Sequence, residues 1–489
     1  MKTIVYTKYG IIKGNEREDG LEFLGIPYAA PPVGKLRFLP PISPEAWKGT
    51  LDCTKFGPAA PQLHVTELKM LEKGEEISED CLKLNVYTPD TAGEKRPVLV
   101  YVHAGAFQKG SGHVGFNSRT YLEQNIVTVT VNYRLGALGF LDFTEYLGEK
   151  YSQSGNTGLL DIIQSLKWVK DNIGYFGGDS GNVTLFGQSA GAKIITSLML
   201  MEKAKGLFHK AFVTSGGVHC IRDRKTAEKI TGLFMREAGL NKENADRLLR
   251  MPWEEIVKAQ TELFKGLNLH TCGPVFDGIN FCKNNALDII RHGKASMVPV
   301  VYGTNRDELQ LYYYAYNFRK LDSYMANRLF GDNADIVLKE YRVRVEEYYT
   351  MENFVEFMTE YIYRQPCLKF CLEMAKAGND SVYMFRNDYD KLPIRAGHCS
   401  EAQFTMREYE KYGVKEHPVF YYRLADSVVE AAAAFMRTGK PYSSNIPEWP
   451  PFTAGEQKIM VWNEEGCYVA KAGKSYVTPD MPEQIYMLE

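Results

Sequence analysis

The segment VTLFGQSAGAKIITSLML, residues 183–200, decides the fold of this chain of 489 residues. Its first residues are β-branched or apolar and predict a buried strand, whereas AKIITSLML has the length and spacing of a helix. Between the two lies Gly187-Gln188-Ser189-Ala190-Gly191, a G-x-S-x-G pattern. Glycines at these places allow a tight strand-to-helix turn that presents the serine hydroxyl at the end of a sheet. Because strand and helix flank the short pattern as this turn requires, we predict Ser189 as a nucleophile.

Strands and helices alternate on both sides of this segment. A helix is predicted over 158–173, where apolar residues recur at helical spacing. The alternation indicates an α/β fold, in which helices cover both faces of a mostly parallel sheet. The predicted strands are PVLVYVHAG (97–105), NIVTVTVNYRLG (125–136), VTLFG (183–187), KAFVTSG (210–216), VPVVYGTN (298–305) and SVYMFRND (381–388).

Two helical, charged regions leave this sheet, over about 222–295 and about 309–377. No linker, low-complexity tract or internal repeat separates them from the rest. We therefore expect a single domain over 1–489, with these regions as helical cap insertions above the site. The first 95 residues predict short strands and turns, and the Pro- and Gly-rich stretch 25–41 predicts an irregular, extended wrap.

Composition and charge exclude several classes of protein. The formal net charge is −2 and no run of Lys and Arg occurs, which argues against a nucleic-acid partner. No apolar run has membrane-span length, and the segment after Met1 does not resemble a signal peptide. The nine cysteines are odd in number and lack metal-site spacing, Cys367 and Cys371 included. We therefore expect reduced thiols, a cytoplasmic location, and no metal or other cofactor.

A serine hydroxyl needs a base, and the base needs an acid that orients it. In α/β-hydrolases these residues follow the nucleophile in the order acid, then histidine. Glu308 lies just beyond the predicted strand 298–305, and His398 lies in the loop IRAGHCSEAQF after the strand 381–388. Both are thus expected at the carboxyl edge of the sheet. Asp307 is the competing candidate for the acid.

The transition state also needs N–H donors for a developing oxyanion. His103-Ala104-Gly105-Ala106-Phe107 follows a predicted strand and is similar to the HGGG-type loop that serves this purpose. The amide of Ala190, directly after the nucleophile, is a further donor. The alternative is that residues 103–107 form only a turn.

Long segments of the chain resemble the type B carboxylesterase and cholinesterase family, with bacterial carboxylesterases of the para-nitrobenzyl esterase type as the nearest members. The resemblance implies the α/β-hydrolase fold, the triad Ser189, Glu308 and His398, and a hydrogen bond from Ser215 near the acid. It assigns the oxyanion donors to Gly105, Ala106 and Ala190. The segments are FLGIPYAAPPVGKLRF, SEDCLKLNVYTP, VNYRLGALGFL, GNTGLLDIIQSLKWVKDNI, FGGDSGNVTLFGQSAGA and MRTGKPYSSNIPEWPPF.

The same resemblance implies two structural ion pairs, Arg37 with Glu79 and Arg134 with Asp161. Three positions depart from the family pattern: Ala104 replaces a glycine, Gln188 replaces the glutamate before the nucleophile, and Ala60 replaces a cysteine that pairs with the Cys81 position in exported members. The last departure also favours a reduced, intracellular protein.

The function expected from the sequence is hydrolysis of small neutral carboxylic esters through an acyl-enzyme, without nucleic-acid or membrane partners. Two alternatives stay open: a catalytically inactive binding protein, and a hydrolase acting mainly on amides, carbamates or thioesters. The sequence defines neither acyl nor alcohol size, nor the oligomeric state. Segment 63–78 is expected either at the rim of the active-site gorge or as a solvated loop.

Overall fold

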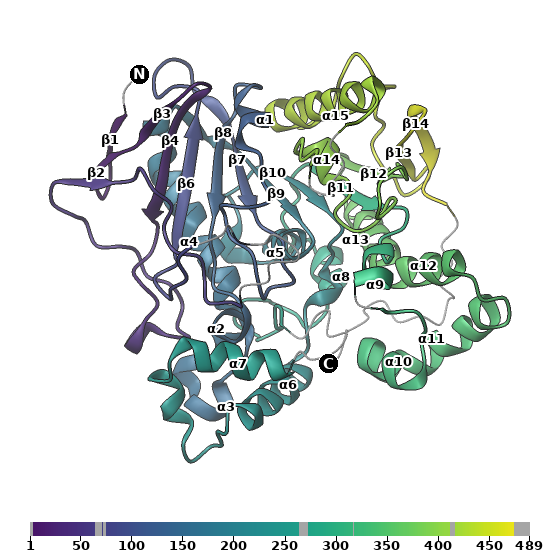
Figure 1. The fold of residues 1–489 in the computed structure, drawn as a ribbon, viewed down its shortest axis with the longest axis horizontal. Helices are drawn as coiled ribbons and strands as arrows, with labels where there is room; N and C mark the ends of the chain where they lie inside the picture. Colours follow the sequence, from purple (N-terminus) through teal and green to yellow (C-terminus); the bar gives the residue numbers. More distant parts are fainter. Residues whose placement is uncertain are drawn as a thin grey trace.

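The structure is a computed structural model that describes residues 3–63, 71, 75–263, 272–315, 317–410 and 416–473. Within that part, an eleven-stranded sheet crosses the molecule in the order β14-β13-β12-β11-β10-β9-β7-β8-β6-β4-β3 (Figure 1). Neighbouring strands from β8 to β13 along this order pair in parallel. The α/β-hydrolase fold predicted from the sequence is thereby confirmed. These parallel strands are β7 (Arg96–Val102), β8 (Val127–Val131), β9 (Gly178–Gln188), β10 (Lys210–Thr214), β11 (Val300–Asn305), β12 (Val382–Asn387) and β13 (Lys458–Asn463).

Antiparallel strands complete the sheet at both edges. They are β3 (Asn15–Arg17), β4 (Gly20–Pro27), β6 (Lys83–Thr88) and β14 (Gly466–Lys471). A separate three-stranded sheet, ordered β1-β2-β5, lies at the N-terminal side (Figure 1) and consists of β1 (Ile4–Thr7), β2 (Gly10–Lys13) and β5 (Thr50–Asp52). The short strands expected in the first 95 residues are therefore present.

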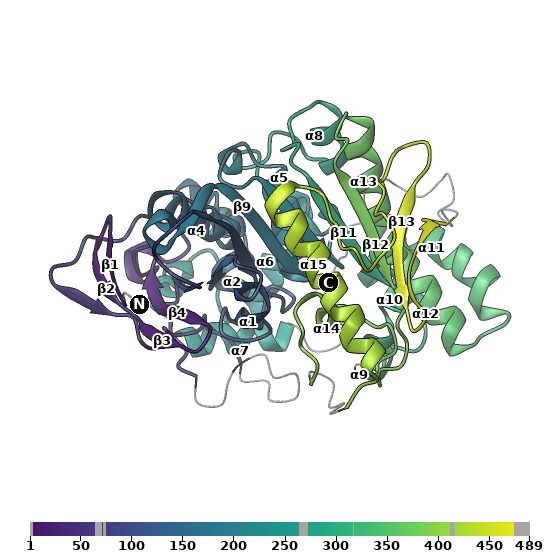
Figure 2. The same cartoon turned by 90° about the horizontal axis from the view of Figure 1, so that it is seen from above.

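Two apolar cores lie on opposite faces of the large sheet. Side chains of a strand alternate between faces, and β7 shows this: Val98 and Val100 join one core, whereas Leu99 and Tyr101 join the other. Figure 2 shows α15 across one face and α4, α5 and α13 beyond the sheet on the other. The first core is covered by α4 (Thr157–Asn172), α5 (Ala190–Met199), α8 (Ala286–Arg291) and α13 (Gln365–Lys376), and the second by α1 (Ser118–Leu122), α14 (Ala402–Thr405) and α15 (Val419–Thr438).

Helices occupy both regions for which the sequence predicts them. A third apolar core, from Leu309 to Tyr363, lies within the second of these regions. The first region contains α6 (Arg224–Glu237), α7 (Trp253–Leu263) and α8, and the second contains α9 (Gln310–Ala315), α10 (Ser323–Phe330), α11 (Ala334–Tyr341), α12 (Met351–Thr359) and α13.

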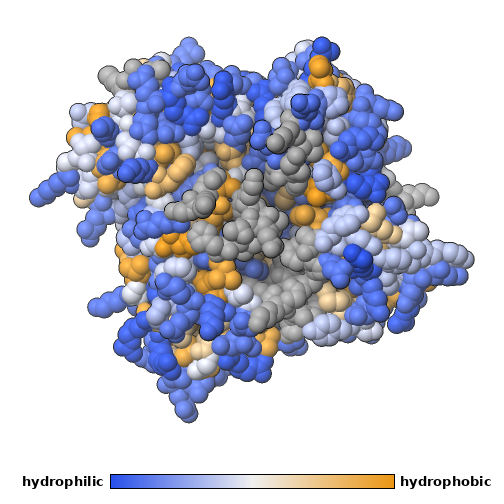
Figure 3. All heavy atoms as spheres, in the orientation of Figure 1, coloured by the Kyte–Doolittle hydropathy of each residue, from blue (hydrophilic) through white to orange (hydrophobic). Residues whose placement is uncertain are grey.

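Hydrophobic side chains on the face shown in Figure 3 gather toward its middle, and hydrophilic ones cover most of its rim. None of the helices in the described part of the chain has the length and apolar character needed to cross a membrane.

One part of the sheet was absent from the sequence prediction. Strands β13 and β14 form a hairpin that extends the sheet beyond β12, with Met460 opposite Phe385. Residues 459–462 of β13 are fully buried, so the run IMVW is a strand signal of the kind that predicted β7 and β8.

Candidate active site

Five neighbouring parallel strands deliver the predicted site residues to one edge of the sheet. In the order β7-β9-β10-β11-β12 their carboxyl ends lie side by side, and Gln188 of β9 is opposite Thr214 of β10. Ser189 follows β9 directly, whereas Glu308 and His398 lie in the connections after β11 and β12. This edge is where open α/β sheets form their sites, because each strand ends in a loop there.

The turn at Ser189 depends on close backbone packing. Ser189 has φ 54° and ψ −117°, a conformation that few non-glycine residues adopt. A Cβ on Gly187 would lie 2.7 Å from the carbonyl carbon of Gly191, and a Cβ on Gly191 would lie 2.0 Å from the carbonyl oxygen of Val102. The two glycines are therefore required, and they let α5 begin directly behind the serine.

Ser189, His398 and Glu308 form a continuous chain of hydrogen bonds. His398 Nε2 lies 2.9 Å from Ser189 Oγ, and His398 Nδ1 lies 2.6 Å from Glu308 Oε2. All three side chains are buried. With Nδ1–H directed at the carboxylate, Nε2 is left to accept a proton from the serine. The arrangement can generate a serine nucleophile.

The surroundings of His398 favour its charged form. Burial opposes protonation, but Cys399, Tyr312 and the bonded Glu308 together raise the pKa of His398 well above its ordinary value. The rings of Tyr363 and Tyr312 pack near the imidazole, at centroid distances of 4.8 and 5.7 Å. Their hydroxyl groups are 2.8 Å apart. Both tyrosines belong to the second helical region, and the sequence did not identify them.

Asp307, the competing acid, pairs with an arginine, whereas the imidazole pairs with Glu308. The carboxylate of Asp307 lies 2.9 Å from Arg306 Nη2. Glu308 instead accepts the hydroxyl of Ser215 at 2.6 Å and the backbone N–H of Asn305 at 2.7 Å. The hydrogen bond expected between Ser215 and the acid is thus formed with Glu308.

A second buried carboxylate, Glu401, lies behind the first. Its two oxygens accept the Thr214 hydroxyl at 2.6 Å and the Asn305 amide at 2.7 Å. Asn305 also donates to Ser215 Oγ at 3.1 Å. Burial, and then the nearby Glu308, raise the pKa of Glu401. We call Glu308, Glu401, Asn305, Ser215 and Thr214 the acidic network. The only indication of Glu401 in the sequence was its place three residues after His398.

The loop after β7 has an unusual backbone. Gly105, Ala106 and Phe107 have φ values of 125°, 54° and 63° in succession, so the peptide units turn sharply beside β9. The His103 ring stacks on Tyr133 at a centroid distance of 4.4 Å, and burial lowers its pKa to about 4. His103 is therefore a neutral support of this loop at physiological pH.

Ala190 and Gln188 flank Ser189. Ala190 is the first residue of α5, where backbone N–H groups have no partner within the helix. Gln188 is buried, and its amide nitrogen lies 3.5 Å from His398 Nε2. Glutamine at this position thus contacts the imidazole without adding a charge.

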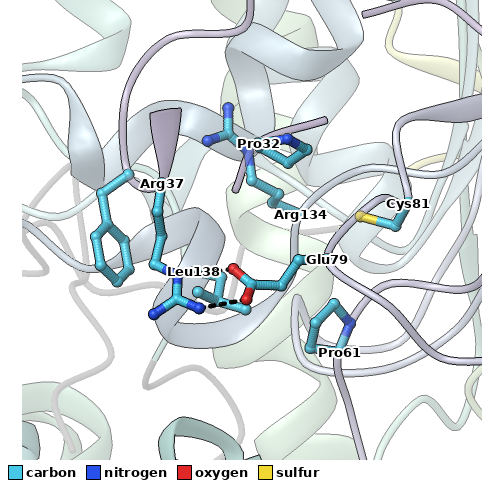
Figure 4. A pocket seen from close by; sticks show the side chains of 8 residues that line it. Pro32, Arg37, Pro61, Glu79, Cys81, Arg134 and Leu138 are labelled. Atoms are coloured by element: carbon cyan, nitrogen blue, oxygen red, sulfur yellow. Dashed lines mark hydrogen bonds and ion pairs between the residues drawn. The ribbon is translucent and has the colours of Figure 1, made fainter. Parts of the chain in front are cut away.

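The two ion pairs implied by the resemblance are formed, away from the triad. Arg37 Nε donates to Glu79 at 2.8 Å, and Arg134 Nη2 lies 2.6 Å from Asp161. Figure 4 shows Arg37, Glu79 and Arg134 lining one pocket, which contains none of the predicted site residues. All nine cysteines are free. Among the described residues no group of three or more acidic, His or Cys side chains is arranged to hold a metal, and most of the segment 63–78 lies outside the described residues.

Comparison with known proteins identifies the family of the chain. The model of the carboxylesterase family matches residues 1–478. The chain belongs to the carboxylesterase family. It is similar to para-nitrobenzyl esterase of Bacillus subtilis, with 33% identity over 484 residues that cover 94% of this chain and 95% of the relative.

Other carboxylesterases are similar over most of their length. A solved carboxylesterase of Geobacillus stearothermophilus superimposes with a TM-score of 0.86 at 34% identity, covering 96% of this chain and 98% of the other. Liver carboxylesterase 1 of Oryctolagus cuniculus is 30% identical over 490 residues, covering 90% and 85%. The resemblance to type B carboxylesterases is confirmed, and the members of this family are carboxylic ester hydrolases whose substrates vary.

Proposed function

We propose that this carboxylesterase-family protein is an active serine esterase that hydrolyses neutral carboxylic esters through an acyl-enzyme. The observation that carries the proposal is the unbroken chain Glu308–His398–Ser189, with 2.6 and 2.9 Å between consecutive groups. An inactive binding protein would have no need to keep the nucleophile, the base and the acid hydrogen-bonded to one another. The chain therefore favours catalysis over the inactive alternative.

In the proposed reaction, Ser189 Oγ attacks the ester carbonyl carbon while His398 Nε2 takes the hydroxyl proton. Glu308 stabilises the resulting imidazolium and keeps the ring in place. When the tetrahedral intermediate collapses, His398 returns that proton to the departing alcohol oxygen. Water then attacks the acyl-enzyme in the same way and releases the carboxylic acid, with Ser189 restored.

We assign the developing oxyanion to the N–H groups of Gly105, Ala106 and Ala190. The sharp turn after β7 and the free N-terminal amides of α5 support this assignment. Losing one such donor typically costs about 2.7–4 kcal/mol of transition-state stabilisation. Ala104 lies outside the three donors, so its replacement of glycine leaves the number of donors unchanged.

The preference for uncharged alcohol groups rests on Gln188. A glutamate there would attract a cationic alcohol with about 3 kcal/mol at 5 Å and an effective dielectric of 20. The glutamine has no charge to offer, and it contacts His398, which must reach the alcohol oxygen.

We also propose that residues 1–489 form one domain in which the two helical regions act as caps that shape the site. Tyr312 and Tyr363, from the second region, pack near His398 and support this role. A cytoplasmic location is proposed as well, supported by nine free cysteines.

A fluorophosphonate probe tests the proposal directly, because it labels only an activated serine. We expect stoichiometric labelling of the wild-type protein at Ser189 and none of Ser189→Ala. Labelling should be accompanied by loss of 4-nitrophenyl acetate hydrolysis. A wild-type protein that neither reacts with the probe nor hydrolyses this ester is the inactive binding protein.

A further inference from the structure

The segment that leaves β10 passes the proposed nucleophile Ser189 and then carries a buried arginine. Ser215 and Gly216 pass directly beside Ser189, since a Cβ on Gly216 would lie 2.4 Å from the carbonyl oxygen of Ser189. The chain then makes a short turn over 218–220 and reaches Arg222, which is only 3% exposed.

Arg222 is held beside the loop that follows β7. Its backbone pairs with the segment around Val275, donating to Pro274 O and accepting from Phe276 N at 2.9 and 2.8 Å. A Cβ on Gly273 would lie 2.6 Å from Arg222 Nη1 and also 3.3 Å from the ring of Phe107. Phe107 directly follows the proposed oxyanion donors, so the guanidinium lies on the oxyanion side of the site.

The guanidinium has donors without acceptors. Nη2 donates to the carbonyl of Cys272 at 3.2 Å, whereas Nε and Nη1 are buried and make no hydrogen bond. No salt bridge to Arg222 occurs among the described residues. The adjacent Asp223 caps α6 by accepting the N–H of Thr226 at 2.7 Å, so its carboxylate serves another purpose.

Two further basic side chains surround this position. Lys193 lies one turn after Ser189 on α5 and is buried. Burial, with a smaller contribution from repulsion by Arg222, lowers its pKa to about 8. His219 is 4% exposed and neither ring nitrogen makes a hydrogen bond. Burial lowers the pKa of Arg222 only to about 10, so its charge persists at neutral pH. We call Lys193, His219 and Arg222 the basic cluster.

A buried charge without a partner destabilises the folded protein, and the open donors add to that cost. A negatively charged ligand would remove both penalties, because a carboxylate accepts charge-assisted hydrogen bonds from a guanidinium. An unsatisfied cation beside a nucleophile therefore indicates the charge of the substrate.

The position also indicates which part of the ester carries that charge. His398 Nε2 must reach the alcohol oxygen to protonate it, so the alcohol lies on the side of His398 and its neighbours Gln188, Tyr312 and Tyr363. The neighbours of Arg222 are a different set, the Phe107 ring and the Cys272 carbonyl among them. The Arg222 guanidinium thus faces the acyl part.

We infer that Arg222 binds a carboxylate at the far end of the acyl group, so that half-esters of dicarboxylic acids are preferred substrates. The inference rests on the proposed esterase function and extends it from neutral esters to this anionic class. Lys193 adds positive potential behind the guanidinium, and His219 closes the cluster as a neutral group.

The test compares three substrates at fixed ionic strength in a pH-stat. Monoethyl glutarate carries a carboxylate on the acyl chain, and ethyl glutaramate replaces it with an uncharged amide of the same shape. The acetate ester of 3-hydroxypropanoate carries the carboxylate on the alcohol instead. We expect wild-type kcat/KM to favour the glutarate over the glutaramate by about tenfold or more, as for a charge-assisted hydrogen bond. We expect no such gain when the carboxylate is on the alcohol.

Arg222→Met should abolish the tenfold preference and leave 4-nitrophenyl acetate hydrolysis, which does not reach the cluster, within about twofold of wild type. Lys225→Met removes an exposed cation three residues further on and is the matched control. It should change neither the preference for glutarate over glutaramate nor the hydrolysis of 4-nitrophenyl acetate. If Arg222→Met does not fold, the wild-type comparison of the three substrates decides alone. Equal rates on glutarate and glutaramate, or a larger gain from the alcohol carboxylate, would overturn the inference. Absence of 4-nitrophenyl acetate hydrolysis would instead remove the esterase function itself.

Discussion

The acidic network and the basic cluster flank the same nucleophile but differ in how they are satisfied. In the acidic network each carboxylate oxygen has a hydrogen-bond partner, and Asn305 links Ser215 to Glu401. In the basic cluster Arg222 and His219 retain buried nitrogens without partners. A satisfied network holds its own geometry and can position His398 for every substrate. The unsatisfied guanidinium of Arg222 gains further acceptors only from a ligand, so it discriminates among substrates.

The largest expected effect comes from the residue that both regions serve. Ser189→Ala should keep the fold, because the hydroxyl supports no other element, and should lower kcat by about 10⁴-fold or more. Circular dichroism and the melting temperature check the fold, and ester hydrolysis checks kcat. Adding His398→Ala to this variant should reduce the rate little further. Fully additive losses would mean that the two side chains do not act as a unit.

Glu308→Gln removes the charge at the centre of the acidic network. We expect kcat/KM to fall by about 10²-fold or more for all esters, as for loss of the group that orients the base. Only neutral His398 accepts the serine proton, and Glu308 helps to raise the pKa of His398, so wild-type activity rises as pH increases through that raised value. Without the carboxylate the acid limb should move to lower pH. An acid limb that stays in place would contradict the pairing seen in the structure.

Glu401→Gln probes the part of the acidic network that does not touch His398. The new NH₂ group cannot accept, so one of the two donors, the Thr214 hydroxyl or the Asn305 amide, loses its acceptor. A buried unsatisfied group costs about 1–3 kcal/mol, and we expect a lower melting temperature and roughly a tenfold loss in kcat. The exposed Glu410→Gln is the matched control and should behave as wild type. Unchanged stability and rate would show that the second carboxylate does not help to hold the first.

Gln188→Glu adds a charge beside His398, on the proposed alcohol side. We expect kcat/KM for a choline ester to improve a few-fold relative to its uncharged isostere. This gain corresponds to only a small part of the Coulomb attraction between the two charges in surroundings that contain little water. Both enzymes and both substrates must be compared at one ionic strength, because salt screens the interaction. A wild-type enzyme that already prefers the choline ester would refute the assignment of Gln188.

The smallest effect is expected from reducing agents. All nine cysteines are free, so dithiothreitol should leave the melting temperature and the activity unchanged. A marked fall in the melting temperature would reveal a disulfide and count against a reducing compartment.

Much of this molecule could be predicted from local sequence, and the remainder depends on distant contacts. Strands β7 to β12 each contain a run of apolar or β-branched residues, and the strand–Ser189–helix turn has its own pattern. The central sheet and the position of Ser189 could therefore be predicted from the sequence. The acidic network was not, because Glu401 is recognised only by its contacts with Asn305 and Thr214. Arg222 is likewise an ordinary loop arginine until the segments around Phe107 and Gly273 enclose it.

The chain of hydrogen bonds joins residues far apart in sequence. Ser189 and His398 are separated by 209 positions, and His398 and Glu308 by 90. Contacts of such long range form late in folding, because the loops between them must close first. No fragment that ends before β12 can hold a base near Ser189. Recovery of the proposed esterase activity after dilution from denaturant therefore reports assembly of the sheet from β7 to β12, whereas far-ultraviolet circular dichroism also registers helices that form early.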